Sequence, residues 1–322
     1  MQIRLFLAAT LIWISAAVPA GAQFKEGGEP EGPKLGPVEV TRWRVGVMVR
    51  ASGGACRGLT GYAAVPTDWP EQEVKVVAEE VSPEVKLHYE TLEKAVKIMS
   101  FKIAQVAAGQ DVKALVTFEV RRNAVLPPED TAKYVLADHK KLPREIRAFL
   151  LPSPRIESRD PKIREVARKI GVDKEKAWEH VEAIYEWVWE HIKDQDCPAK
   201  SAVAALRDGT GNCEERSSLF IAICRAADIP ARTVWVPGHC YSEFYLEDEK
   251  GQGHWFPCQS RGAKQFGGIT DLRPIFQKGD NIRPPRNGGK ERQRFLGESL
   301  IGSPMPGGGK PQVKFIREPV AK

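Results

Sequence analysis

The sequence predicts an α+β fold in which an all-β sandwich domain precedes a core of helices followed by strands. Valine-rich runs with period-two alternation fill residues 38–125, and turn residues separate them as in a β-sandwich. After Pro127 and Pro128 the apolar residues recur instead at three- and four-residue steps, which is the period of a helix. The 322 residues are enough for two domains, and their 42% hydrophobic content is ordinary for a globular protein.

The N-terminus has the features of a secretory signal peptide over residues 1–22. A short basic start precedes an apolar stretch over 5–18, and residues 20–22 form an A-x-A cleavage site. The apolar stretch is shorter than the ~20 residues that span a bilayer. We therefore expect cleavage near Ala22, export to the periplasm or the exterior, and no stable membrane insertion. Residues 23–37, which are rich in Gly, Pro and Glu, are expected to be a flexible linker.

The predicted sandwich domain contains five strand-like runs, at 38–50, 74–77, 85–89, 95–103 and 114–120. Cys56 lies in a glycine-rich segment after the first run and is expected in a turn. No catalytic motif falls within 38–125. A structural domain packed against the core is therefore the favoured interpretation, and a substrate-binding module is the alternative.

Two helices are expected in the first half of the core. Asp160 is a candidate N-cap, with Pro161 at the first helical position. Asp173 is expected to cap a longer helix. Its apolar residues recur at helical steps: Ala177, Val181, Ile184, Val188 and Ile192. The same helix carries three tryptophans, Trp178, Trp187 and Trp189. Packing is their expected role, and lining a substrate cleft is the alternative.

Cys213 stands at the start of a third helix. It follows the glycine-rich turn 209–212 and opens an apolar helical run, with Asn212 as the expected N-cap. Unpaired N–H groups and the positive end of the helix dipole favour a thiolate there. The backbone N–H of Cys213 is also placed to help hold a developing oxyanion. Cys224 falls on nearly the same helix face and is expected to be a buried structural thiol.

Three strands are expected after this helix, over 232–236, 241–246 and 254–257. His239 lies at the entry to the second strand, where an imidazole can take the proton of a thiol. Gln259 follows the third strand, where its amide oxygen can orient the imidazole. This order of residues indicates a cysteine nucleophile site.

Four blocks of the sequence resemble the catalytic core of the transglutaminase-like superfamily, which has the papain-like cysteine enzyme core. The blocks are Gly211-Asn212-Cys213, residues 225–232, His239-Cys240-Tyr241-Ser242-Glu243 and Trp255-Phe256-Pro257-Cys258-Gln259. The resemblance extends over about 156–259. It implies a transglutaminase-like core at residues 126–283, of the bacterial secreted type with an N-terminal β-sandwich, whose catalytic residues are Cys213, His239 and Gln259.

Three residues depart from the family's pattern. Asp228 replaces a glycine at the helix exit, where an aspartate still tolerates left-handed backbone. Tyr241 replaces a tryptophan. Gln259 replaces an aspartate, so that the hydrogen bond to the imidazole is retained without the charge.

The resemblance implies an exported thiol acyl-transfer enzyme that acts on peptide amide bonds, as a protease or amidase rather than a cross-linker. Its partner would be a peptide or protein substrate. Because Gln259 is uncharged, a catalytically weak or inactive transglutaminase-like binding or scaffold protein is the alternative. No cofactor is expected, since no acidic calcium loop appears. A metal site of Cys240, His254 and Cys258 is a weak third interpretation, because it lacks a C-x-x-C pair.

The C-terminal residues 284–322 are expected to form an irregular basic tail rich in Pro and Gly, with 313–316 as its only strand-like run. The net charge of +6 is mild. Its local excess lies around Arg283, Arg286, Lys290, Arg292 and Arg294. No aromatic residues interleave with these cations, so we expect a solvated linker and no nucleic-acid partner.

Strand register gives a final prediction. If His239 opposes Gln259 across an antiparallel pair, Cys240 opposes Cys258 one step along, on the sheet face away from Cys213. The Cα atoms of opposed residues lie within disulfide range. An exported chain would then either bridge these two cysteines or keep both as free core thiols.

Overall fold

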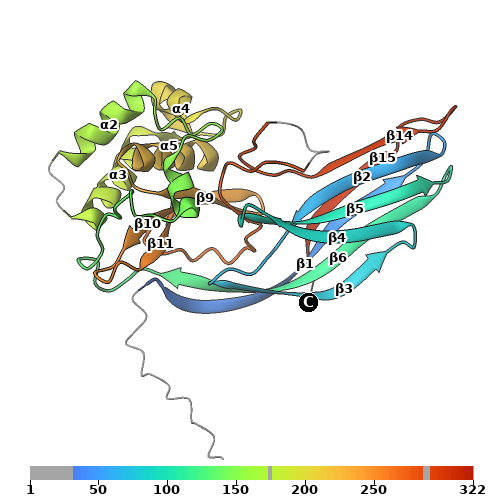
Figure 1. The fold of residues 1–322 in the computed structure, drawn as a ribbon, viewed down its shortest axis with the longest axis horizontal. Helices are drawn as coiled ribbons and strands as arrows, with labels where there is room; N and C mark the ends of the chain where they lie inside the picture. The colour runs from blue at the N-terminus through green and yellow to red at the C-terminus, as the bar shows by residue number, and fades with distance from the viewer. Residues whose placement is uncertain (1–31, 173–175, 286–290, 322) are drawn as a thin grey trace, which may run out of the picture. The chain divides into compact units, whose positions relative to one another are not determined.

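The computed structural model describes residues 32–172, 176–285 and 291–321, and residues 32–322 form one compact unit. Several predictions fall outside the described residues: the signal peptide, residues 23–31 of the linker, the Asp173 cap, Arg286 and Lys290. The predicted α+β fold with a β-sandwich is confirmed, with the helices gathered at one end of the long strands (Figure 1).

One layer of the sandwich is a four-stranded antiparallel sheet in the order β15-β1-β6-β3. Its strands are β1 (Lys34–Arg50), β3 (Gln72–Val81), β6 (Asp111–Leu126) and β15 (Gln312–Val320). The facing layer contains β2 (Cys56–Val65), β4 (Val85–Leu92), β5 (Val96–Val106) and β14 (Ser299–Pro304). Alternate valines of β1, at most 1% exposed, fill the core between the layers: Val45, Val47 and Val49.

The predictions for the two ends of the chain are wrong in part. The linker ends early, because β1 begins at Lys34. The tail is not irregular, since β15 pairs with β1 and β14 pairs with β2. Both tail strands depend on partners from the first third of the chain, and such pairing outweighs local propensity. Cys56 begins β2 instead of lying in a turn.

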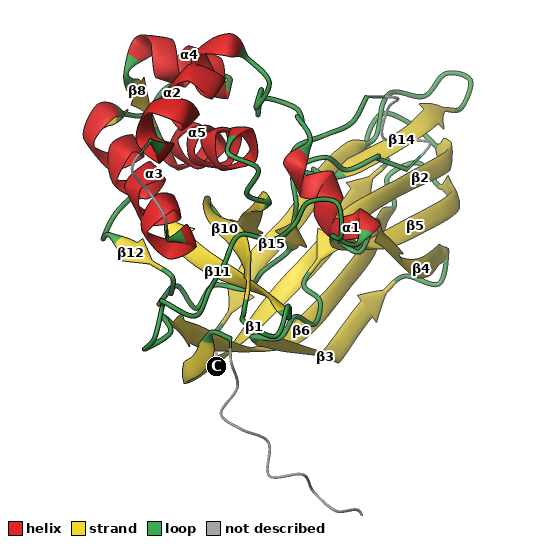
Figure 2. Cartoon of the chain, turned by 60° about the vertical axis from the view of Figure 1, so that its left-hand side comes forward, coloured by secondary structure: helices red, strands yellow, loops and turns green. Residues whose placement is uncertain are grey.

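The helical part is built around α5 (Cys213–Ala226), which packs against β9 (Ala231–Val236) and β10 (His239–Glu247) (Figure 2). The other helical segments are α1 (Arg144–Arg147), η1 (Ala148–Leu150), α2 (Pro161–Gly171), α3 (Ala177–His191) and α4 (Ala202–Asp208). A short parallel pair joins β7 (Lys193–Asp194) to β8 (Thr210–Gly211). Among the described residues, no helix is long and apolar enough to cross a bilayer.

A local signal sets the start of the first long helix. Asp160 caps α2 as predicted, and its side chain accepts a hydrogen bond from Lys162 N at 2.8 Å. The next helix, α3, begins at Ala177. Trp178 on this helix is 7% exposed and contacts the rings of Phe244, Phe256 and Phe266, so packing is its role.

One continuous sheet joins the sandwich to the helical part. Its order is β12-β11-β10-β9-β13-β5-β2-β14, with β11 (Gly253–Gln259), β12 (Gln265–Phe266) and β13 (Gln277–Lys278). Lys278 of β13 is buried, and its Nζ lies 2.6 Å from a carboxylate oxygen of both Glu71 and Glu243. These ion pairs tie the sandwich to the strand that carries the histidine of the candidate site.

Candidate active site

Cys213 is the first residue of α5, as the sequence predicts, and Asn212 is its N-cap. Asn212 Oδ1 accepts a hydrogen bond from Glu214 N at 2.8 Å, and Glu215 Oε2 accepts one from Asn212 N at 3.2 Å. This capping box satisfies two of the free donors at the helix start and holds the turn that carries Cys213. A side chain at Gly211 would bring its Cβ to 2.6 Å from Glu215 Cβ, which explains the glycine.

His239 begins β10 directly after a two-residue turn from β9. Gly238 in this turn has a φ of 69°, which glycine adopts without strain. His239 pairs with Val236, and the three predicted strands are found as β9, β10 and β11. The hairpin therefore sets the position of the imidazole relative to the N-terminus of α5.

Gln259 ends β11 and contacts the imidazole. Its Oε1 lies 3.3 Å from His239 Nε2, and its Nε2 donates a weaker hydrogen bond of 3.4 Å to Ala263 O. The amide oxygen accepts from His239 Nε2 when that nitrogen carries the proton. Nδ1 is then the ring nitrogen that can receive a proton from the thiol.

Tyr185 fixes the backbone of Gln259, a role that the sequence does not reveal. Its hydroxyl donates to Gln259 O at 2.7 Å and accepts from Gln265 N at 3.0 Å. Burial raises the pKa of Tyr185, so the hydroxyl keeps its proton for this hydrogen bond. The helical position of Tyr185 in α3 predicts core packing, and only the fold brings it to the end of β11.

The sulfur of Cys213 has two neighbours on β10. The Cys240 thiol donates a hydrogen bond to it and is the largest cause of the low pKa of Cys213; burial opposes this effect. The hydrogen bond and charge of His239 and the backbone N–H of Cys240 also lower the pKa, which falls to about 3. The same sulfur–sulfur hydrogen bond, followed by burial, raises the pKa of Cys240 well above its usual value. These pKa shifts favour the thiolate at Cys213 and the thiol at Cys240.

The predicted register of β10 and β11 is wrong. Ser242, not Cys240, opposes Cys258, and Cys240 pairs with Trp235 of β9. The reason is that His239 lies beyond the last residue of β10 that pairs with β11, so it meets Gln259 diagonally. All six cysteines are free thiols, and Cys240 faces Cys213 instead of pointing away from it.

Cys258 and Cys224 lie in the helical core with no exposed surface, as expected for Cys224. Burial raises the pKa of both thiols well above the usual value, and they lie close enough for the charge of one to affect the other. His254 Nε2 lies 2.9 Å from Asp248 Oδ2, and no group of three or more possible metal ligands occurs in the described part of the chain.

Arg294 connects the tail to the first turn of α5. Its Nη2 donates to Glu214 O at 2.6 Å, and its Nη1 lies 3.3 Å from Glu214 Oε2. Gln277 Nε2 donates to Arg294 O, and the guanidinium stacks 5.2 Å from the Trp235 ring. Arg294 is 6% exposed, so this part of the tail is not the predicted solvated linker. Burial raises the pKa of Glu214, and the charge of Arg294 offsets only part of this rise.

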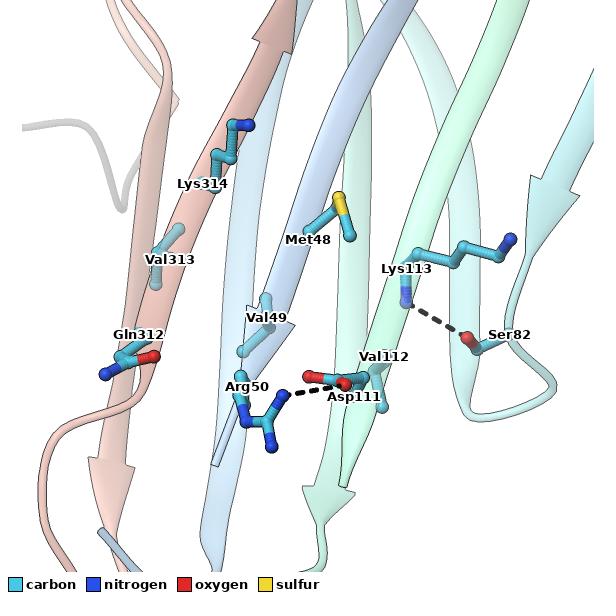
Figure 3. A pocket seen from close by; sticks show the side chains of 10 residues that line it. All are labelled: Met48, Val49, Arg50, Ser82, Asp111, Val112, Lys113, Gln312, Val313 and Lys314. Atoms are coloured by element: carbon cyan, nitrogen blue, oxygen red, sulfur yellow. Dashed lines mark hydrogen bonds and ion pairs between the residues drawn. The ribbon is translucent and has the colours of Figure 1, made fainter. Parts of the chain in front are cut away.

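Two hollows lie along β1, and Cys213 is not among the residues that line either. A hollow of about 330 Å³ is close to the histidine turn, because Arg273 in its wall donates to Pro237 O at 3.0 Å. The other, of about 540 Å³, lies where β1, β6 and β15 run side by side, around Met48, Lys113 and Lys314 (Figure 3). Neither hollow was predicted from the sequence.

Comparisons with known proteins agree with this geometry. Residues 164–260 match the model of the transglutaminase-like superfamily, which confirms the resemblance carried by the four sequence blocks. Among curated proteins, none matches the chain. A crystal structure of a protein from Cytophaga hutchinsonii, described as a putative cysteine protease, aligns with a TM-score of 0.59 and 16% identity over 89% of this chain and 92% of that one. The fold is therefore shared along almost the whole length.

A second structure, described as a putative protease from Parabacteroides distasonis, aligns with a TM-score of 0.27 and 15% identity. That alignment covers 69% of this chain and 43% of the other.

Proposed function

We propose that this protein is a cysteine enzyme that cleaves peptide amide bonds, with Cys213 as nucleophile, His239 as proton carrier and Gln259 as the residue that orients His239. The observation that carries the proposal is the cysteine at the first position of α5, whose pKa is lowered by Cys240 and His239, together with the hydrogen bond between that imidazole and Gln259. The superfamily match over residues 164–260 supports the same class of chemistry.

Acylation follows from this arrangement. The Cys213 thiolate attacks the amide carbonyl, and the charge on the carbonyl oxygen develops at the N-terminus of α5, where the backbone N–H of Cys213 is placed to help hold it. His239 then gives a proton to the departing amine, and a thioester with Cys213 remains. Gln259 keeps Nε2 of the imidazole engaged, so Nδ1 is the nitrogen that carries the proton.

Deacylation reverses the proton transfers. His239 takes a proton from water, the resulting hydroxide attacks the thioester, and Cys213 leaves as a thiolate. A leaving group that is already stable as an anion needs no protonation, which suits a thiol of such low pKa. An amine could replace water as the acceptor. We favour water because hydrolysis requires only solvent access.

A binding or scaffold protein is the second candidate, and the uncharged Gln259 is the observation that favours it. The amide oxygen orients the imidazole but adds no charge to stabilise an imidazolium. A protein of this kind would keep the reactive thiolate and complete no turnover.

The experiment is a comparison of the wild-type chain with Cys213→Ala on fluorescently labelled denatured casein, with and without a fluorescent primary amine. Release of labelled peptides by the wild type alone supports hydrolysis. Incorporation of the amine into casein supports transfer instead. If neither occurs while Cys213 still reacts with iodoacetamide, the scaffold candidate is correct.

We also propose that the protein is exported after cleavage near Ala22, and that its partners are peptides or proteins. The basic start, the apolar stretch and the A-x-A site over residues 1–22 support export. N-terminal sequencing of the protein secreted from a bacterial host tests this. A mature chain that begins at Gln23 would support it, and a chain that retains Met1 in the cytoplasm would contradict it.

A further inference from the structure

Cys240 is a buried free thiol that the proposed reaction does not use. It is the second residue of β10, next to His239, and no part of it is exposed. Its thiol donates a hydrogen bond to Cys213 Sγ, and its backbone N–H donates to the same atom. α5, which begins with Cys213, packs against β10, which carries Cys240 as its second residue. The fold thus places a second thiol beside the proposed nucleophile.

We propose that Cys240 is a resolving thiol, which forms a disulfide with Cys213 when the protein meets hydrogen peroxide and thereby protects Cys213 from irreversible oxidation. Formation of this bond rests only on the two thiols. The accompanying reversible loss of activity rests on the proposed function, since it requires that Cys213 is the nucleophile.

The proposed oxidation has two steps. The Cys213 thiolate attacks one oxygen of hydrogen peroxide, which gives a sulfenic acid at Cys213 and releases hydroxide. The Cys240 sulfur then attacks the sulfenic sulfur; the S–S bond forms, the S–O bond breaks, and water leaves with the proton of Cys240. The two sulfur atoms together lose two electrons, which reduce the peroxide.

The first step also prepares the second. The largest cause of the raised pKa of Cys240 is its hydrogen bond to the Cys213 thiolate. Conversion of Cys213 to an uncharged sulfenic acid removes that cause, so Cys240 loses its proton more easily at the moment when it must attack. The imidazole of His239, the adjacent residue, is available to relay this proton to the departing oxygen, which leaves as water.

The other cysteines provide a contrast within the chain. Cys224 and Cys258 also lie near one another, but both are fully buried and both keep their protons. Burial and its carboxylate neighbour Glu215 raise the pKa of the partly exposed Cys197. Since peroxide reacts with accessible thiolates, oxidation should begin at Cys213 and be resolved by Cys240.

The test treats the reduced full chain with a small molar excess of hydrogen peroxide, blocks the remaining thiols with N-ethylmaleimide at low pH, and maps the peptides by mass spectrometry. We expect a linked pair of peptides that contains Cys213 and Cys240, lighter than the two free peptides by two hydrogen atoms, and its complete loss after dithiothreitol. In the Cys240→Ser variant we expect Cys213 to be trapped by dimedone as sulfenic acid and then to advance to sulfinic acid, which dithiothreitol does not reverse.

Cys224→Ser is the matched control, and it should give the same linked pair as the wild type. The proposal is overturned if the wild type yields no Cys213–Cys240 pair, or if Cys213 in the wild type reaches the sulfinic acid as fast as in Cys240→Ser. The wild-type map alone decides the matter if either variant fails to fold. A chain that forms the linked pair but cleaves no peptide would contradict the proposed function and leave this proposal standing.

Discussion

Gln259 Oε1 lies 3.3 Å from His239 Nε2, although the two residues are not opposed in the sheet. The contact depends on the side chain of Gln259 reaching across the ends of two strands, while the Tyr185 hydroxyl holds its backbone at 2.7 Å. A neutral amide therefore stands where an aspartate would add a charge. The consequence for reactivity can be measured directly.

Gln259→Asp should accelerate alkylation of Cys213 by up to roughly tenfold only at pH values near or below the Cys213 pKa of about 3, where part of the thiol is protonated, because a charge-assisted hydrogen bond is about twice as strong as a neutral one. In the same pH range Gln259→Ala should slow alkylation about two- to tenfold, through loss of a hydrogen bond worth about 1 kcal/mol. The measurement is the second-order rate with iodoacetamide. Gln105→Asp, on the exposed face of β5, is the control and should leave the rate unchanged. Equal rates in all four proteins would show that Gln259 does not act on the imidazole.

The pKa of about 3 predicts how Cys213 reacts across the pH range. In a Cys197→Ser background, the alkylation rate of Cys213 should stay constant between about pH 5 and pH 8. Over the same range, the alkylation rate of an ordinary thiol rises about tenfold per pH unit. His239→Ala removes a hydrogen bond and a charge that lower the pKa, so the rate should fall most at the acid end. A wild-type rate that rises tenfold per pH unit would show that Cys213 is not a thiolate in this range.

Lys278→Ala should destabilise the whole described unit by about 3–5 kcal/mol, because it leaves the buried carboxylates of Glu71 and Glu243 without their shared partner. Urea denaturation followed by tryptophan fluorescence measures the loss. Lys75→Ala, on the exposed face of β3, serves as the comparison and should cost less than about 0.5 kcal/mol. Similar losses for the two variants would mean that the buried ion pairs contribute little.

The low pKa of Glu243 predicts that the folded protein keeps this stabilisation in moderately acidic solution. Burial would raise the pKa of this carboxyl, but the charges and hydrogen bonds of Arg232 and Lys278 hold it down to about 2. Because the folded-state pKa lies below the unfolded one, the stabilisation is complete above about pH 4.5 and is lost as the pH falls through about 2. Melting temperatures of the wild type and Glu243→Gln, taken at pH values from about 2 to 6, should converge only at the acid end. A constant difference would contradict the low pKa.

Arg294→Gln should lower the free energy of unfolding by about 1.5–3 kcal/mol, the range for hydrogen bonds to charged groups, since it removes both contacts with Glu214. The pKa of Glu214 should rise further once this neighbouring charge is gone. Thermal and urea unfolding measure the first effect. Arg283→Gln provides the matched control, because Arg283 is exposed, and its stability should equal that of the wild type.

The sequence predicts those features that depend on neighbours in the chain. The cap at Asn212, the start of α5 at Cys213 and the strands around His239 all follow from local signals, and each is found. Asp228 also has the predicted left-handed backbone, with a φ of 59°. These features need no knowledge of which segments meet in space.

Features that depend on distant partners were missed. β2 escapes detection because its glycines break the apolar alternation; at Gly61 an added Cβ would lie 2.3 Å from Ser299 O of β14. The β10–β11 register was wrong by two residues, since nothing in either strand marks where pairing stops. Cys240 was assigned to the wrong face for the same reason. The prediction assumed that successive side chains alternate between the two faces of a regular strand. Cys240 lies at the start of β10, outside the part that pairs with β11.

The pairing of β1 with β15 joins the first and last described strands of the chain, with every residue of the proposed site between them. β1 lacks one of its two neighbours until the C-terminal residues are available. During synthesis, the pairing of β1 with β15 and the contact of Arg294 with Glu214 behind α5 can therefore form only after Cys213, His239 and Gln259 have all been made. The residues of the proposed site thus come before two of the contacts that hold the structure around them.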